Sequence, residues 1–171
     1  MTDAQPRSEY VVRPATMADR AAVEGLLRAA GLPLDGLDEQ FGEQYAVADS
    51  AGRVVGAEGM ERHGASGLLR SAVVDAAWRG RGVGDRLTSD RLDWARRSGL
   101  RDVWLLTTTA AAYFPRFGFV VADRAAAPPT LQQSREFASA CPASATAMRL
   151  VLDSSTDTAA GTGALATGES R

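Results

Sequence analysis

The chain has 171 residues, of which 45% are hydrophobic and 23% charged, and its formal net charge is −2. This length and apolar content suffice for one compact domain with a real core. The slightly acidic balance argues against a general nucleic-acid binder, which needs an excess of lysine and arginine on one face. There is no apolar run near 20 residues and no N-terminal signal pattern, so we expect no membrane association and a cytoplasmic location.

Cysteine and histidine each occur once, as Cys141 and His63. One cysteine cannot form an internal disulfide, and these two residues do not supply the ligands of a structural zinc site, so we expect no metal. Cys141 lies in a segment of small residues, which favours a buried, unreactive thiol over a nucleophile. His63 precedes Gly64 in a predicted hairpin turn, where we expect an exposed side chain.

The first part of the chain predicts a strand followed by a helix. Residues 1–9 are polar and predicted to be flexible, and residues 10–13 form a strand that ends at Pro14. Thr16 and Asp19 have the spacing of a capping box at the start of a helix. The apolar residues that continue this helix before Gly31 are Val23, Leu26, Leu27 and Ala30. Residues 34–43 are compatible with a short second helix.

The middle of the chain predicts strands separated by turns. Three strands, at 44–48, 53–62 and 67–75, form an antiparallel meander. A helix at 82–97 and a strand at 101–107 then complete a right-handed parallel crossover. The inward stripe expected for this helix contains Val83, Leu87, Leu92, Trp94 and Ala95. A last strand is expected at 145–152, whereas residues 153–171 are rich in Ser, Thr, Ala and Gly and are predicted to be disordered.

The segment from Val73 to Gly84 is the most informative part of the sequence, because it reads as a strand, a glycine-rich loop and a helix start. Three glycines at alternate positions, 80, 82 and 84, allow a tight turn whose amides converge on one anion. The helix adds its positive end, and two arginines can meet phosphate oxygens. The spacing matches neither a P-loop nor a dinucleotide fingerprint. An ordinary strand-to-helix turn is the alternative.

The spacing Arg79-x-x-Gly82-x-Gly84 resembles the acetyl-CoA loop of the GCN5-related N-acetyltransferases (GNAT). Residues 110–119 resemble the short helix and Gly-Phe exit of the same superfamily. The resemblance implies an α/β fold over residues 10–152: a central, mostly antiparallel sheet flanked by helices, with a parallel pair of strands that splay apart. It also implies acetyl-CoA as cosubstrate and an acceptor site walled by residues 34–43. The implied cofactor-binding residues are Val73, Val74, Arg79, Gly80, Arg81, Gly82, Val83 and Gly84.

Acetyl transfer to an amine requires a base, because a free amine is mostly protonated at neutral pH. Glu61 is the first candidate, near the end of a predicted strand beside the splay. Glu58 is the alternative, on the opposite face of the same strand. Each is equally compatible with a solvated strand residue. A backbone N–H of Val73 or Val74 would stabilise the oxyanion.

The position of the general acid, which protonates the sulfur of the leaving CoA, differs from the family pattern. Many members place a tyrosine four residues before the glycine of Gly-Phe, whereas this chain has Phe114 there and Tyr113 beside it. One residue along a helix is about 100° of rotation, so Tyr113 is not a simple substitute. Because a thiolate is a tolerable leaving group, catalysis does not depend on a dedicated acid.

Arg70 and Ser71 are candidates to clamp an acceptor carboxylate, with Arg116 a weaker one. A salt bridge between Arg70 and Glu61 is the equally supported alternative.

Several segments, among them residues 68–71, 105–109 and 128–144, are similar to the arsenic-resistance N-acetyltransferases, a group akin to amino-acid N-acetyltransferases. This similarity implies acetylation of the amine of a small acidic amino acid or of a toxic glutamate mimic containing arsenic or phosphorus. A protein or peptide N-acetyltransferase and a non-catalytic acyl-CoA-binding module remain alternatives. We expect a small-molecule partner, no nucleic acid, and a monomer or homodimer.

Overall fold

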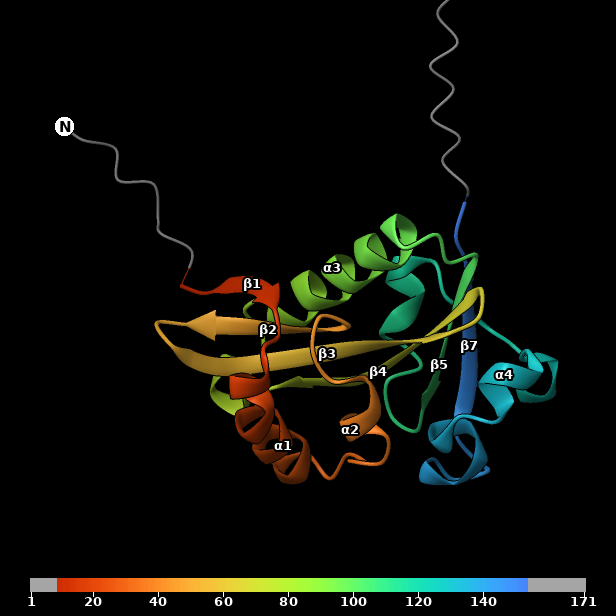
Figure 1. Cartoon of the computed structure of the whole chain (residues 1–171), viewed down its shortest axis with the longest axis horizontal. Coiled ribbons are helices and arrows are strands. Elements are labelled where there is room, and N and C mark those ends of the chain that lie inside the picture. The colour runs from red at the N-terminus through yellow and green to blue at the C-terminus, as the bar shows by residue number, and fades with distance from the viewer. Residues whose placement is uncertain (1–8, 154–171) are drawn as a thin grey trace, which may run out of the picture.

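The computed structural model describes residues 9–153. The predicted flexible N-terminus and disordered tail fall almost entirely outside this range. The described residues form a mixed sheet with helices on both faces (Figure 1), which confirms the predicted fold class. The seven strands of this part of the chain are β1 (Val11–Pro14), β2 (Tyr45–Ser50), β3 (Arg53–His63), β4 (Ser66–Val74), β5 (Asp102–Thr107), β6 (Val120–Val121) and β7 (Thr146–Val151), in the order β1-β2-β3-β4-β5-β7-β6.

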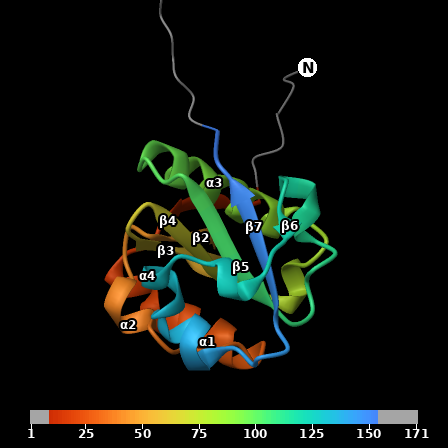
Figure 2. The ribbon, with the colours of Figure 1, turned by 90° about the vertical axis from the view of Figure 1, so that its right-hand side faces the viewer.

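The two faces of the sheet are covered by different helices. The long helix α3 (Val83–Arg97) crosses one face, and α1 (Arg20–Ala29) and α2 (Leu37–Gln40) cover the other, as Figures 1 and 2 show from two sides. Side chains of β2 alternate between these layers. Ala46 and Ala48 pack with residues of α3, while Tyr45 and Val47 pack with residues of α1. A further short helix, α4 (Pro129–Gln132), lies near the β7 side.

Helix starts and stops follow the local signals with small shifts. The Thr16–Asp19 capping box is present, but it begins a 3-10 turn, and α1 starts at Arg20. The predicted helix of residues 110–117 is shorter: a 3-10 turn at Phe114–Phe117 that ends at Gly118, whose φ of +94° favours glycine.

The prediction of which α3 residues face the core was partly wrong. Trp94 is only partly buried, whereas Arg91 is 2% exposed. The Arg91 guanidinium tolerates burial because it donates to the carbonyl oxygen of Glu43 at 3.0 Å and to the Asp90 carboxylate at 2.7 Å.

The parallel strands β4 and β5 part after a short ladder. Three residue pairs are in register, the last of them Leu68 with Trp104. On the other side of β4, Glu58 of β3 is opposed by two residues, Ser71 and Ala72, since the register moves from Gly59–Arg70 to Ala57–Val73. This is a β-bulge, and its backbone strain lies at Ser71, a non-glycine residue with φ of +56°. The bulge bends β4 away from β5 and opens the sheet.

Candidate active site

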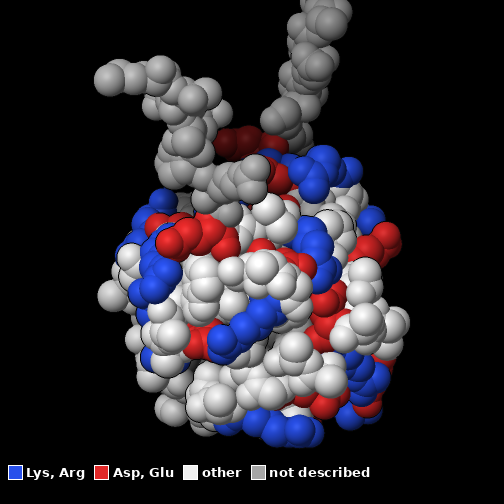
Figure 3. Space-filling model, turned by 90° about the vertical axis from the view of Figure 1, so that its left-hand side faces the viewer, with Lys and Arg blue, Asp and Glu red and all other residues white. Residues whose placement is uncertain are grey.

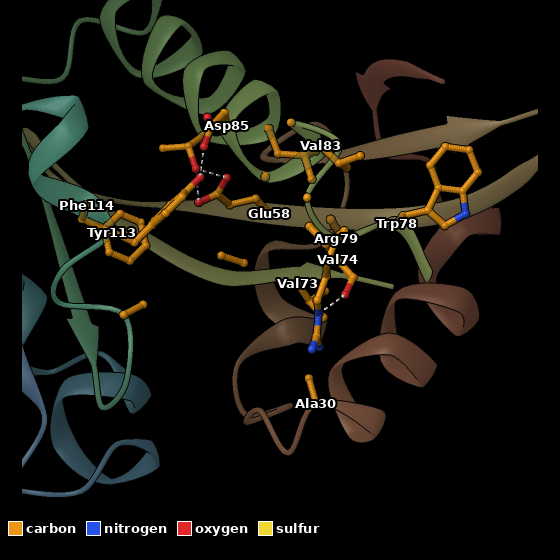
Figure 4. Close-up of a pocket in the computed structure, with 18 of the residues that line it drawn as sticks. Ala30, Glu58, Val73, Val74, Trp78, Arg79, Val83, Asp85, Tyr113 and Phe114 are labelled. Atoms are coloured by element: carbon orange, nitrogen blue, oxygen red, sulfur yellow. Dashed lines mark hydrogen bonds between the residues drawn. The ribbon is translucent and has the colours of Figure 1, made fainter. Parts of the chain in front are cut away.

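A cleft of about 890 Å³ lies where β4 and β5 separate (Figure 4). The end of β4, the glycine loop, the start of α3 and the segment after β5 surround it. The residues that line it include Ala57, Glu58, Val73, Val74, Trp78, Arg79, Gly80, Gly82, Val83, Gly84, Asp85, Thr88, Tyr113, Phe114 and Arg116. Most of the implied CoA-binding residues are therefore gathered around one opening.

The glycine loop needs its glycines for backbone conformation. Gly80 and Gly82 have φ of +76° and +78°, and a Cβ at either position would meet no atom within 4 Å. Gly82 is the N-cap of the 15-residue helix α3. The amides of residues 80–82 make no hydrogen bond to another described residue. Together with the helix start, these amides are free to bind an anion such as a pyrophosphate.

The two arginines of the loop point to different places. Arg79 lines the cleft, and its Nε lies 3.4 Å from the carbonyl oxygen of Val74. Arg81 is outside the cleft lining: its guanidinium stacks 4.8 Å above the Trp78 ring and its Nη1 lies 2.9 Å from Glu9. On the face shown in Figure 3, basic and acidic side chains are interspersed rather than separated.

The backbone of Val74 faces the opening between the strands. Asp75 donates its amide to the carbonyl oxygen of Val55 at 2.8 Å, and Val74 is the next residue, in register with Gly56. Hydrogen-bonded positions alternate along an antiparallel ladder, so the N–H and C=O of Val74 point away from β3. The contact of Arg79 with the Val74 oxygen is consistent with this direction. Of the two candidate oxyanion donors, the geometry favours Val74.

Glu58 lies at the cleft, on the α3 face of β3. Glu58 is 1% exposed, and Oγ1 of Thr88 lies 3.1 and 2.9 Å from its two carboxyl oxygens. Burial raises the pKa of Glu58 to about 8, an effect partly opposed by the Thr88 hydroxyl and by Arg91.

Glu61 lies on the other face and does not line the cleft. Arg70 Nη1 contacts its Oε1 at 2.6 Å, and His63 Nε2 contacts its Oε2 at 2.9 Å. Burial would raise the pKa of Glu61, but His63 and Arg70 outweigh it and lower the pKa. The expectation that His63 is exposed was wrong, because its side chain is only 16% exposed against Glu61.

Arg70 forms the centre of a buried ion cluster. Besides Glu61, its Nε contacts the Ser71 hydroxyl at 3.2 Å and lies 3.2 Å from Oε2 of Glu136 without hydrogen-bond alignment. Burial raises the pKa of Glu136 to about 7. The structure thus contains the Arg70–Glu61 salt bridge, one of the two alternatives considered from the sequence. Gly36, in the loop before α2, packs against this pair.

Tyr113 and Arg116 lie on the α3 side of the cleft. The Tyr113 hydroxyl donates to Oδ1 of Asp85 at 2.7 Å, and burial and Asp85 together raise its pKa. The Arg116 guanidinium stacks 4.4 Å from the Tyr113 ring, and its Nη1 lies 3.3 Å from Asp85. Phe114 is buried beside them and packs against Phe119.

Four residues of these sites were not singled out from the sequence: Trp78, Asp85, Thr88 and Glu136. Thr88 had a usable signal, since it is a polar residue next to Leu87 in the apolar stripe of α3. Cys141 is partly buried, 3.7 Å from Oε1 of Glu136, and burial raises the pKa of its thiol to about 11. A thiol in this state is a poor nucleophile at neutral pH.

Within residues 9–153, no cluster of three or more His, Cys, Asp or Glu side chains is arranged to hold a metal ion. In the same part of the chain, no helix has the length and apolarity needed to cross a membrane.

Residues 41–121 match the family model described as "Acetyltransferase (GNAT) domain". Among solved structures, Rv2747 of Mycobacterium tuberculosis in complex with CoA and NLQ is 25% identical, with a TM-score of 0.72 over 83% of this chain and 99% of that chain. N-acetylglutamate synthase of Neisseria gonorrhoeae, complexed with coenzyme A and N-acetyl-glutamate, is 18% identical, with a TM-score of 0.73 over 86% of this chain and 36% of that chain.

The ribosomal-protein-S18-alanine N-acetyltransferase of Escherichia coli is 18% identical, with a TM-score of 0.64 over 83% of this chain and 93% of that chain. No curated protein sequence gives a significant match. The matched residues, 41–121, include the glycine loop and most of the residues that line the cleft, so this part of the chain is a GNAT acetyltransferase domain. It is an acetyl-CoA-dependent N-acetyltransferase, which removes the non-catalytic alternative.

Proposed function

We propose that this enzyme transfers the acetyl group of acetyl-CoA to the primary amine of a small acidic amino acid or of a glutamate-like analogue containing arsenic or phosphorus. The observation that carries the proposed chemistry is the buried Glu58 carboxyl in the same cleft as the free loop amides. The pyrophosphate binds the amides of residues 80–84 and Arg79, and the pantetheine arm follows the exposed backbone of β4.

The proposed reaction is a direct attack on the thioester. Glu58, as carboxylate, takes one proton from the acceptor ammonium, and the amine nitrogen forms a bond to the acetyl carbon. The Val74 N–H stabilises the oxyanion. The C–S bond then breaks and the nitrogen gives up its second proton, either to water while CoA leaves as thiolate, or to the sulfur through the Tyr113 hydroxyl, which ends the step protonated as it began. We assign the base to Glu58 rather than Glu61, because the Glu61 oxygens are both occupied by Arg70 and His63.

The charges around the cleft favour an anionic or zwitterionic acceptor over a polycation. The charged lining residues are Glu58, Arg79, Asp85 and Arg116. Asp85 is already bound by Tyr113 and Arg116, and a Glu58 with a pKa of about 8 is mostly neutral at pH 7. Arg70 and Ser71, which lie outside the cleft lining, offer a two-pronged site for a carboxylate once an acceptor displaces the misaligned Glu136. The N-acetyl-glutamate complex of the gonococcal synthase supports the same acceptor class.

A peptide acceptor is the second candidate, favoured by the likeness to the ribosomal-protein N-acetyltransferase. An extended peptide needs an open groove, but the loop before α2 packs on Arg70 through Gly36. Arg135 also joins Glu39 of α2 at 2.9 Å. These contacts leave at that face a cavity of only about 240 Å³, too small for an extended peptide.

A thiol-release assay with purified protein tests the acceptor class. We expect release of CoA with glutamate, aspartate and their phosphinic or arsinic analogues, and little with alanine-terminated peptides or polyamines. A peptide that reacts fastest would instead establish the second candidate. The cytoplasmic location and the monomeric or homodimeric state stay predictions from the sequence.

A further inference from the structure

The hydroxyl of Thr88 links helix α3 to Glu58 of β3 inside the cleft. Thr88 is 1% exposed on α3, and its Oγ1 lies 3.1 and 2.9 Å from the two Glu58 oxygens. The same hydroxyl lowers the pKa of the Tyr113 phenol, against the larger and opposite effects of burial and Asp85. Figure 4 shows the side chains of Glu58, Asp85 and Tyr113 pointing toward one another.

One hydroxyl proton cannot satisfy two carboxylate oxygens at once. When Glu58 is protonated, its own O–H can donate to the Thr88 oxygen while the Thr88 O–H donates to the other carboxyl oxygen, so both short contacts are satisfied. When Glu58 is ionised, the Thr88 O–H can donate to the carboxylate. The pair therefore accommodates both protonation states that a base must pass through.

We propose that Thr88 is a positioning residue for acetyl transfer: it holds the Glu58 carboxyl toward the bound acceptor amine and stabilises its ionised form. The inference rests on the proposed role of Glu58. Asp85 and Thr88 are three residues apart on α3 and share one face, so the helix whose start is proposed to bind the pyrophosphate also orients the base. Donor binding and base placement thus depend on the same rigid element.

Glu58 is also influenced by other charged groups of the elements around it. On α3 these are Arg91, which favours the carboxylate, and Asp90, which opposes it. Tyr113, after β5, interacts with Glu58, and it holds Asp85 by a hydrogen bond. The adjacent position of β2 is the apolar Ala46, and the two β4 residues opposite Glu58 are Ser71 and Ala72. Thr88 is the group with a hydrogen bond to Glu58, so its hydroxyl is the one to remove.

The test uses Thr88→Val, which keeps the branched shape, and Thr88→Ser, which keeps the hydroxyl. We expect Thr88→Val to lower kcat at pH 7 by about 10-fold to 100-fold and to leave the KM for acetyl-CoA within about twofold. Its pH–rate profile should shift to higher pH, because a rise of one pKa unit lowers the carboxylate fraction about tenfold below the pKa. Thr88→Ser should restore most of the rate.

The matched control is Ser89→Ala, which removes a hydroxyl from the exposed side of the same helix and should behave as wild type. In a double-mutant cycle, Thr88→Val should cost little further rate in a Glu58→Gln enzyme. A Thr88→Val profile that is lowered equally at all pH values, or full additivity with Glu58→Gln, would overturn the inference. If Glu58→Gln keeps its activity, the proposed base itself fails, which is a distinct result. Thermal unfolding of every variant separates these outcomes from loss of fold.

Discussion

Nη1 of Arg70 lies 2.6 Å from Oε1 of Glu61, and both side chains are almost fully buried next to the loop that precedes α2. Removing one partner of such a pair leaves an uncompensated charge in the interior. We therefore expect Arg70→Met to lower the free energy of unfolding by about 3–5 kcal/mol in urea titrations. Arg53→Met, which removes an exposed pair with Asp75, should cost less than about 1 kcal/mol. Equal losses in the two variants would contradict this.

The two candidate bases are separable by the kind of damage their removal causes. Glu58→Gln should lower kcat by at least about 100-fold without loss of stability, because a buried, largely neutral carboxyl is replaced by a group of the same shape. Glu61→Gln should instead destabilise the protein, since it leaves Arg70 without its closest partner, and lower kcat by less than about tenfold. Steady-state kinetics beside urea unfolding give both readouts. The reverse pattern would return Glu61 to the role of base.

The stability of the protein should depend on pH through Glu58. Its pKa is about 8 in the folded protein against a reference of 4.5, so between these values the folded state keeps a proton that the unfolded state has released. The free energy of unfolding therefore falls as pH rises through this window, by about 1.4 kcal/mol per pH unit for this group. Glu136, whose pKa is raised to about 7, acts in the same direction. The measurement is the slope of the unfolding free energy against pH between pH 5.5 and 7.5, compared between wild type and Glu58→Gln. Parallel slopes would show that Glu58 is ionised in the folded protein.

We expect replacement of Gly82 to weaken acetyl-CoA binding, and replacement of Gly31 to leave it unchanged. Both have positive φ and open space around the missing Cβ, so alanine at either position costs a similar backbone strain of about 1–2 kcal/mol. Gly82→Ala should in addition raise the Kd for acetyl-CoA, measured by calorimetry, because the loop amides move. Gly31→Ala, after α1, is the control for strain alone. A similar Kd in both variants would argue against anion binding by the loop.

Tyr113→Phe should lower kcat by less than about tenfold. The hydroxyl it removes is held by Asp85, and the thiolate is already a tolerable leaving group at neutral pH. Single-turnover rates of CoA release measure the effect. A loss above about 100-fold would assign to Tyr113 the proton transfer that Phe114 cannot perform.

The sequence predicted those parts of the fold that depend on neighbouring residues. Alternating strands, the capping box at Thr16 and the glycine loop act over a few residues, so pattern and turn chemistry identify them. The family resemblance added the splay of β4 and β5.

The partners of buried charges could not be predicted in this way. Arg70 contacts Glu136, which lies far from it in the sequence. Arg91 can be buried because the carbonyl oxygen of Glu43, in the loop before β2, accepts a hydrogen bond from it. The bulge places Ser71, a non-glycine residue, at positive φ, which no local preference indicates. Each depends on tertiary contacts that override the local pattern.

The short ladder between β4 and β5 divides the sheet into two parts joined by three residue pairs. A donor whose amide-bearing arm lies between these strands would supply the missing cross-strand hydrogen bonds. Hydrogen exchange should therefore slow on both sides of the opening when acetyl-CoA is added, at Val74 as well as in the second half of β5. The substrate would then act as a temporary strand of its own enzyme.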